Sequence, residues 1–272
     1  MELSMYTCYA LGKGFSSPAE SFRHFYEKGV RFGDMVDDEF LRMPFHLYCD
    51  TLIEAGITPE AVVSMVDIAS FSAPDREKNL SIVKGYIDQM EKRKVGILML
   101  APSVRSANSE DEFKIMRELL IAGFQKVVDY SEGSGISVTI ENQSTLQRAD
   151  SKTEDVRYIL DCVPKLGLVL DTGNFFCVGE DILGAYELLK DRMVHMHCKD
   201  WVYNPYGHFV RENIPRFEGT AIGEGLIPIK ELFNRLKKDK YLGNAVLEIN
   251  ASPITLEMLD RSADFMRKEI YS

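Results

Sequence analysis

Short apolar runs recur along the whole chain, and longer stretches with a helical pattern separate most of them. Strands buried on both faces give short, nearly continuous apolar runs. Eight runs of this kind are found: Leu3–Tyr9, Gly29–Val36, Ala61–Ile68, Val95–Leu100, Ser137–Ile140, Gly167–Leu170, Met193–Met196 and Asn244–Ile249. The pattern therefore predicts eight β-strands.

Three of the intervening stretches carry clear helix signals. Residues 17–29 (SPAESFRHFYEKG) begin with Ser-Pro and end at a glycine. Residues 109–135 have an acidic first turn, an apolar stripe of helical period and a glycine stop. Residues 226–243 are amphipathic and also end at a glycine. Strands that alternate with helices in this way are typical of a parallel sheet.

Eight alternating strands and helices are most economically arranged as an α/β fold, a single (β/α)8 TIM barrel of ~250 residues. An open doubly wound sheet is the runner-up. It is disfavoured because the first strand is followed by ALGKGF, whose glycine spacing does not fit the dinucleotide-binding turn. No low-complexity or Pro/Gly/Ser-rich linker divides the chain, so we expect residues 1–272 to form one domain.

Composition excludes several classes of protein. The 272 residues are 45% hydrophobic and 27% charged, as in ordinary globular proteins. A net charge of −10 argues against nucleic acid as a partner, because nucleic-acid footprints are basic. The N-terminus MELSMYTCYA does not resemble a secretory signal, and no run of ~18 apolar residues predicts a membrane span. The five cysteines form no C-x-x-C pair and suit a reducing compartment, so we expect a cytoplasmic protein.

Polar residues follow four of the expected strands at the end where a TIM barrel places its functional groups. These residues are Glu141 in SVTIENQS, Asp171 in LGLVLDTGN, His195 and His197 in MVHMHCKDW, and Glu248 in NAVLEIN. Glu141, Asp171, His197 and Glu248 then form a ring at the barrel mouth. The period-two alternation of a strand places Thr139, Val169, His195 and Val246 one layer below this ring, and Gln143, Gly173, Lys199 and Asn250 one layer above it.

Three carboxylates and an imidazole at one barrel mouth would repel one another without a cation. The pattern therefore predicts one divalent metal ion, and this oxygen-rich set suits Mn²⁺, Mg²⁺ or Co²⁺, with Zn²⁺ also possible. Each residue alone has a simpler interpretation. A glutamate at a strand end is usually solvated, Asp171 before Thr-Gly can cap a helix, and His195 is interpreted as structural. Their occurrence on four successive strands, at an expected equal height, favours a shared site.

The motifs VTIENQS, LVLDTGN, VHMHCKD and GTAIGEGLIPIKELFNRLKKDKYLGNAVLEIN resemble those of the xylose isomerase-like barrel superfamily of sugar and sugar-phosphate isomerases and epimerases. The resemblance covers roughly residues 137–250, whereas the N-terminal half is similar only in its strand–helix rhythm. It implies that Glu141, Asp171, His197 and Glu248 bind one metal ion. His197 is selected over His195 because the superfamily's histidine ligand lies three residues before an acidic residue, here Asp200.

The resemblance also implies proton transfer next to a carbonyl of a small sugar or polyol substrate, with Glu141 and Glu248 as the catalytic acid and base. Many relatives carry a histidine three residues after the aspartate of strand six, where this chain has Asn174, which cannot shuttle a proton. The leading expectation is an isomerase or epimerase acting through an enediolate. The alternatives are a dehydratase of a cyclic polyol ketone and a non-catalytic sugar-binding barrel. A nuclease for damaged DNA is disfavoured by the five histidines and the acidic charge.

The loop after the seventh expected strand, residues 201–225, is long, and long loops in compact domains are usually functional. Its aromatic residues Trp201, Tyr203 and Tyr206 could cover the mouth or pack on a second subunit of a homo-oligomer. The expected substrate-binding residues are Asn174, Lys199, His208 and Arg211. Weaker candidates follow the second and third strands: Asp34, Asp37, which could equally cap a helix, and Asp67.

Overall fold

Eight parallel strands of the computed structural model, which describes residues 1–102, 105–207, 209 and 216–272, close into a barrel. The order around the barrel is β1-β10-β7-β6-β5-β4-β3-β2. The strands are β1 (Leu3–Tyr6), β2 (Phe32–Val36), β3 (Thr58–Ser64), β4 (Ile97–Leu100), β5 (Ser137–Glu141), β6 (Gly167–Asp171), β7 (Met193–Cys198) and β10 (Ala245–Leu247). The expected (β/α)8 barrel is therefore confirmed.

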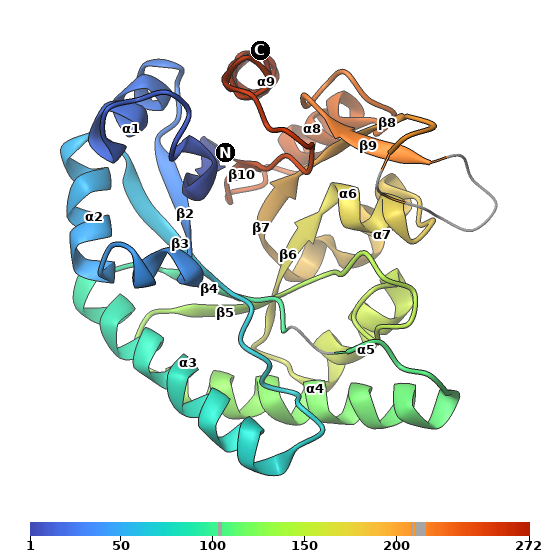
Figure 1. Cartoon of the computed structure of the whole chain (residues 1–272). Coiled ribbons are helices and arrows are strands. Elements are labelled where there is room, and N and C mark those ends of the chain that lie inside the picture. The colour runs from blue at the N-terminus through green and yellow to red at the C-terminus, as the bar shows by residue number, and fades with distance from the viewer. Residues whose placement is uncertain (103–104, 208, 210–215) are drawn as a thin grey trace.

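Helices lie around the outside of the barrel (Figure 1). The α-helices are α1 (Pro18–Glu27), α2 (Phe45–Glu54), α3 (Ala73–Arg93), α4 (Glu110–Ser131), α5 (Thr153–Cys162), α6 (Thr172–Cys177), α7 (Ile182–Leu189), α8 (Ile229–Lys238) and α9 (Leu256–Tyr271), and the 3-10 helices are η1 (Thr7–Ala10), η2 (Asp37–Leu41) and η3 (Lys190–Arg192). The start signals have their expected cause, since the hydroxyls of Ser17 and Ser109 each accept a hydrogen bond from a backbone N–H of the first turn. Among the described helices, none is both long and apolar enough to cross a membrane.

The main apolar core lies between the strands and the helices, while the interior of the barrel is mixed. One part of the interior holds a separate apolar cluster: Val63, Met99, Ala101 and Val169. Fully buried polar side chains of the inner face make up another part: Ser4, Asp34, Thr139, His195 and His197. Buried polar groups are costly unless they are paired, so this part of the interior must form a connected network.

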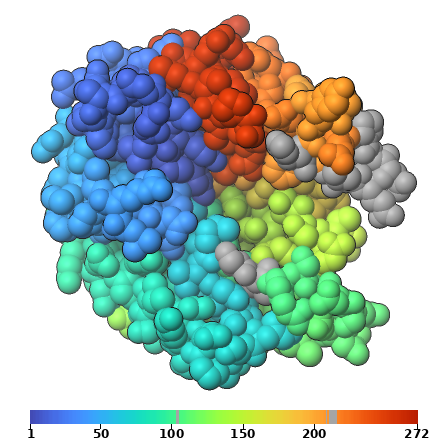
Figure 2. Space-filling model, viewed as in Figure 1, coloured from blue at the N-terminus to red at the C-terminus, as the bar shows by residue number. Residues whose placement is uncertain are grey.

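Pairing of β1 with β10 closes the barrel and brings the two ends of the chain together. Leu3 is opposite Ala245, and α9 also contacts β1. In the space-filling view the C-terminal segment lies directly beside the N-terminal one (Figure 2).

Extra residues interrupt the pairing of β2 with β3 and of β6 with β7. Glu60 is the unpaired residue on β3, and Val194 is the unpaired residue on β7. Bulges of this kind change the direction of neighbouring side chains and are frequent beside functional sites. Because of the bulge at Val194, the next inward-facing residues of β7 come into register with β6, and His197 lies opposite Asp171.

The four predicted site residues do not all stand at one height in the ladder. Asp171 pairs with His197, but Glu141 pairs with Val169 and His197 pairs with Val246. The expected equal height therefore holds only for Asp171 and His197. The offset by two residues on either side arises because the strands of a closed barrel are staggered.

The long loop after β7 contains an antiparallel hairpin that the sequence pattern did not predict. Its strands are β8 (Asp200–Tyr203) and β9 (Phe217–Thr220), with Trp201 opposite Gly219. A side chain at Gly219 would meet the backbone of Asn250 at 2.5 Å, so the hairpin packs closely on the segment after β10.

Candidate metal centre

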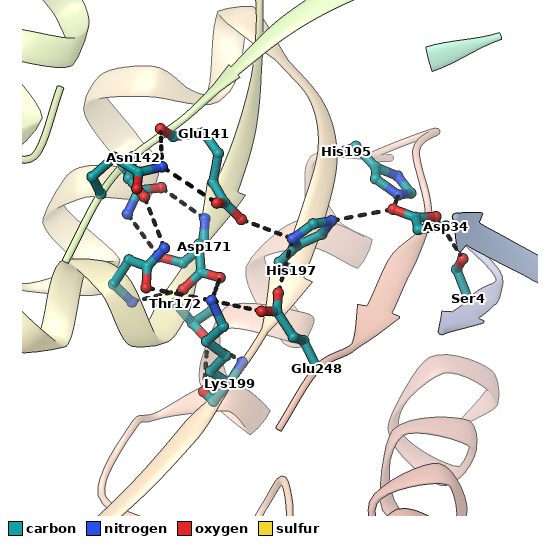
Figure 3. A network of polar contacts seen from close by, with 12 residues as sticks. Ser4, Asp34, Glu141, Asn142, Asp171, Thr172, His195, His197, Lys199 and Glu248 are labelled. Atoms are coloured by element: carbon teal, nitrogen blue, oxygen red, sulfur yellow. Dashed lines mark hydrogen bonds and ion pairs between the residues drawn. The ribbon is translucent and has the colours of Figure 1, made fainter. Parts of the chain in front are cut away.

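Four side chains from adjacent barrel strands converge at the carboxyl end of the barrel. Glu141 and Asp171 end β5 and β6, His197 lies in β7, and Glu248 directly follows β10. One potential ligand atom from each lies within 4.8 Å of those of the others, and all four side chains are buried. The structure thus brings together the four residues that the sequence analysis proposed as ligands (Figure 3).

The ring of His197 lies at the centre of this group. Its Nδ1 is 2.8 Å from Oε1 of Glu141 and 3.0 Å from Oε2 of Glu248. A single N–H cannot be well directed at two carboxylates at once. Neighbouring ligands at right angles around an ion, with bonds of ~2.1 Å, lie ~3 Å apart, so the observed spacing fits a common ion.

The carboxylate oxygens give a second test of whether the site fits a cation. Oδ2 of Asp171 and Oε2 of Glu248 are buried and receive no hydrogen bond of acceptable geometry from the described residues, although both lie close to basic side chains. Burial raises the pKa of Asp171 to about 7, opposed by Lys199 and reinforced by Glu141 and Glu248. Three buried carboxylates with an imidazole are the donor set of a divalent-metal site, so the residues present fit such an ion.

Lys199 points into this group. Its Nζ lies 2.8 Å from Oδ2 of Asp171 and 2.8 Å from Oε1 of Glu248, and the side chain is buried. Burial lowers the pKa of Lys199, but the nearby carboxylates outweigh it and hold the pKa above its ordinary value. Lys199 therefore supplies one positive charge against the three carboxylates, and its role as a substrate contact remains a prediction.

Asn174 and Asn142 connect the ends of β5 and β6. The amide of Asn142 exchanges two hydrogen bonds with the backbone of Asp171, while Nδ2 of Asn174 donates to the carbonyl of Asn142 at 2.9 Å. The backbone N–H of Asn174 donates to Oδ1 of Asp171 at 2.6 Å. Both asparagines thus hold the Asp171 carboxylate in place. Strand alternation gave no reason to single out Asn142, because its neighbour Glu141 faces the interior.

Two aromatic residues near the end of β1 also border the site and were not singled out from the sequence. The ring of Tyr6 lies edge-on to His197, with centroids 5.2 Å apart, and stacks on Tyr9. Burial, with added repulsion from Glu248 and Glu141, raises the pKa of the Tyr6 hydroxyl. Their only signal in the sequence was their position at the end of the first strand.

The remaining predicted residues have different outcomes. His208 and Arg211 lie outside the described residues. Trp201 is fully buried within the hairpin, where Nε1 donates to the carbonyl of Gly173 at 3.1 Å, whereas Tyr203 and Tyr206 are exposed. Trp201 therefore anchors the hairpin on α6.

Asp37 does not cap the following α-helix, because η2 intervenes; its Oδ2 accepts a hydrogen bond from the Ser64 hydroxyl at 2.6 Å. Asp67 accepts a local hydrogen bond from the backbone N–H of Ala69. Asp34, by contrast, contacts both histidines of β7.

Asp200, which the sequence analysis used only to choose between the two histidines, organises the loop after the hairpin. Its carboxylate accepts hydrogen bonds from the backbone N–H groups of Trp201, Gly223, Gly225 and Ile227, at 2.8 to 3.1 Å. Four donors on one buried carboxylate fix the segment from Gly223 to Ile227, which leads into α8.

Comparison with known proteins identifies the family. A family model described as xylose isomerase-like TIM barrel matches residues 17–269. The chain belongs to this family.

Among curated relatives, inosose dehydratase of Mesomycoplasma hyopneumoniae (strain J) is 27% identical over 158 residues, which are 54% of this chain and 49% of that protein. The chain thus spans about half the length of the curated relatives it matches.

Solved structures of low sequence identity share the fold over nearly the whole chain. D-psicose 3-epimerase of Clostridium cellulolyticum H10, crystallised with D-tagatose, aligns with a TM-score of 0.77 at 15% identity and covers 99% of both chains. The IOLI protein with a bound zinc atom aligns with a TM-score of 0.74 at 16% identity, over 100% of this chain and 95% of the other. Both confirm the barrel.

Proposed function

We propose that this chain is a divalent-metal-dependent enzyme that removes and returns a proton next to the carbonyl of a small sugar-like or polyol substrate, as an isomerase or epimerase. The observation that carries the proposal is the placement of two glutamates on either side of His197. Glu141 and Glu248 approach Nδ1 of His197 from two sides, at 2.8 and 3.0 Å (Figure 3). Two carboxylates arranged around one ion can act as base and acid on a substrate bound between them.

Glu141, Asp171, His197 and Glu248 would hold the ion. When bound there, a divalent ion supplies Lewis-acid stabilisation of the negative charge that develops on the substrate oxygens. One glutamate accepts the proton from the carbon next to the carbonyl, and the electron pair of the broken C–H bond passes into the enediolate. The other glutamate donates a proton to the opposite face or to the neighbouring carbon, which gives an epimer or an isomer. Lys199 balances the charge of Asp171 and Glu248 throughout.

A dehydratase is the second candidate, favoured by two observations. The matched curated relatives are inosose dehydratases, and Asn174 stands where a proton-shuttling histidine is common in epimerases. In that reaction a glutamate removes the same proton, but the electron pair forms a C=C bond and a β-hydroxyl leaves as water after receiving a proton. The second glutamate, in its protonated form, is the candidate donor of that proton, because the carboxylates around Lys199 hold its pKa above the ordinary value and it therefore keeps its proton.

The two reactions are separated by incubating Mn²⁺-loaded protein with ketoses, hydroxypyruvate and inososes in D₂O. We expect deuterium at a carbon next to a carbonyl, and a loss of more than about 100-fold in exchange rate with Glu141→Gln. Glu257→Gln, an exposed substitution on α9, is the matched control and should behave as wild type. A product that lacks one water assigns the dehydratase. Exchange that continues unchanged in Glu141→Gln, or that is absent with every substrate, would contradict the proposal.

A further inference from the structure

Besides Glu141 and Glu248, a third buried carboxylate contacts the proposed metal ligand His197: Asp34 lies at the opposite side of its ring. Asp34 lies on β2, across the barrel, and is fully buried. Its Oδ2 lies 3.2 Å from Nε2 of His197 and 2.9 Å from Nε2 of His195. Its Oδ1 accepts a hydrogen bond from the hydroxyl of Ser4 at 3.1 Å (Figure 3).

This contact determines which ring nitrogen of His197 faces the other carboxylates. Since Nε2 must carry a proton to donate to Asp34, the lone pair of the neutral ring is left on Nδ1. Nδ1 is the atom that faces Glu141 and Glu248. A histidine that donates its second N–H to a carboxylate is held in one tautomer and orientation, and is a stronger ligand.

We propose that Asp34 is a positioning residue that presents Nδ1 of His197 to a divalent metal ion, and that His195 and Ser4 hold Asp34 for this purpose. The inference rests on the proposed function, because it requires the metal site. The proposal also gives a role to His195, which lies two residues before the proposed ligand His197. His195 supplies a second N–H to Oδ2 of Asp34, so the carboxylate cannot rotate away from His197 without losing a buried hydrogen bond.

The strand irregularities support this arrangement. The bulge at Val194 brings His195 and His197 together onto the inward face in register with β6. The bulge on β3 falls beside Asp34, at the point where its pairing with β2 shifts by one residue. The backbone of Asp34 is fixed as well, since its carbonyl accepts a hydrogen bond from the hydroxyl of Thr7 at 2.9 Å. The carboxylate is therefore constrained at its backbone and at both oxygens.

The test measures metal binding directly. Metal-stripped wild type, Asp34→Asn, Asp37→Asn and His197→Gln are titrated with Co²⁺ against a chelator, and the visible spectrum of the bound ion is recorded. Asp37 is the matched control, because it is a buried aspartate just after the same strand that bonds to Ser64 instead of to a histidine. We expect Asp34→Asn to lose about 10- to 100-fold in Co²⁺ affinity and to change the spectrum. Asp37→Asn should retain the affinity and spectrum of wild type.

The outcomes separate this inference from the proposed function. If wild type does not bind Co²⁺, or if His197→Gln binds it equally well, the metal site itself is refuted and both proposals fail. If His197→Gln loses Co²⁺ while Asp34→Asn keeps wild-type affinity and spectrum, only the role of Asp34 is refuted. An equal loss in Asp37→Asn would also refute it. If Asp34→Asn does not fold, Ser4→Ala replaces it, with an expected loss of about threefold, and unchanged affinity there overturns the inference.

Discussion

Replacing Glu60 with glutamine should stabilise the metal-free protein relative to wild type, and by more at alkaline pH than at acid pH. Glu60 is the extra residue on β3, and its side chain is 14% exposed. Oε1 accepts a hydrogen bond from Nδ2 of Asn244 at 2.6 Å, while Oε2 has no hydrogen-bond partner among the described residues and lies 4.0 Å from Nε2 of His195. Glutamine keeps the shape and the acceptor for Asn244 but carries no charge.

The size of the effect follows from the pKa of Glu60, which rises from 4.5 to about 6 on folding. Burial is the largest cause, and repulsion from Asp34 adds to it, while His195 opposes it. Between these two values the folded chain retains a proton that the unfolded chain has released, so stability falls as pH rises through this window and is level above it. A difference of about 1.5 pKa units corresponds to ~2 kcal/mol.

Urea unfolding with a chelator present measures this difference. At pH 8 we expect the free energy of unfolding of Glu60→Gln to be ~2 kcal/mol higher than that of wild type. At pH 5 the gain should fall to ~0.8 kcal/mol, because this pH lies between the two pKa values of Glu60 and only part of the destabilisation of wild type has developed. Glu257→Gln, whose side chain is 81% exposed, is the control and should show no such pH dependence. A gain that is the same at both pH values, or a loss of stability at pH 8, would refute the reasoning.

Two further substitutions test the surroundings of the proposed metal centre. Asp200→Asn should destabilise the protein by ~3 kcal/mol, because an amide N–H₂ replaces an oxygen that accepts hydrogen bonds from backbone N–H groups. Urea unfolding, followed by the fluorescence of Trp201, the single tryptophan, measures the change. A stability equal to that of wild type would contradict the expectation. Lys199→Met should raise Co²⁺ affinity roughly tenfold, because it removes a positive charge 2.8 Å from oxygens of Asp171 and Glu248. Chelator competition measures the change, and an unchanged or lower affinity would show that Lys199 does not oppose the ion.

The barrel and the proposed ligands were predictable because both follow from local patterns. Alternation along each strand fixes which side chains face inward, and the fold places functional groups at the carboxyl ends of strands. Glu141, Asp171 and His197 are each the last or nearly the last inward residue of a strand, so each could be identified without knowing the exact register. The choice of His197 over His195 came from the family resemblance and from the higher position of His197 at the barrel mouth.

The partners of these residues were less predictable, since they depend on how strands are offset from one another. The bulges at Glu60 and Val194 change register by one residue, and no single-sequence pattern marks them. Asp34 could therefore be named only as a weak candidate, although it contacts His197. Lys199 was expected at the rim, but its long side chain folds back onto Asp171 and Glu248. The β8–β9 hairpin was missed because its pairing joins segments far apart in a long loop.

All four proposed ligands lie in or directly after β5, β6, β7 and β10, which are consecutive around the barrel, and β1 to β4 supply none of them. The proposed ligands thus lie on one half of the barrel, and the loops of the other half are left to form the rest of the mouth. Segments following β2 to β4 can accumulate substitutions, insertions or grafted sequences without altering the ligand set, whereas Thr7 after β1 must stay, because it holds the backbone of Asp34. A lineage built on this plan can change its substrate while keeping its reaction, and a laboratory library confined to those segments offers the same freedom.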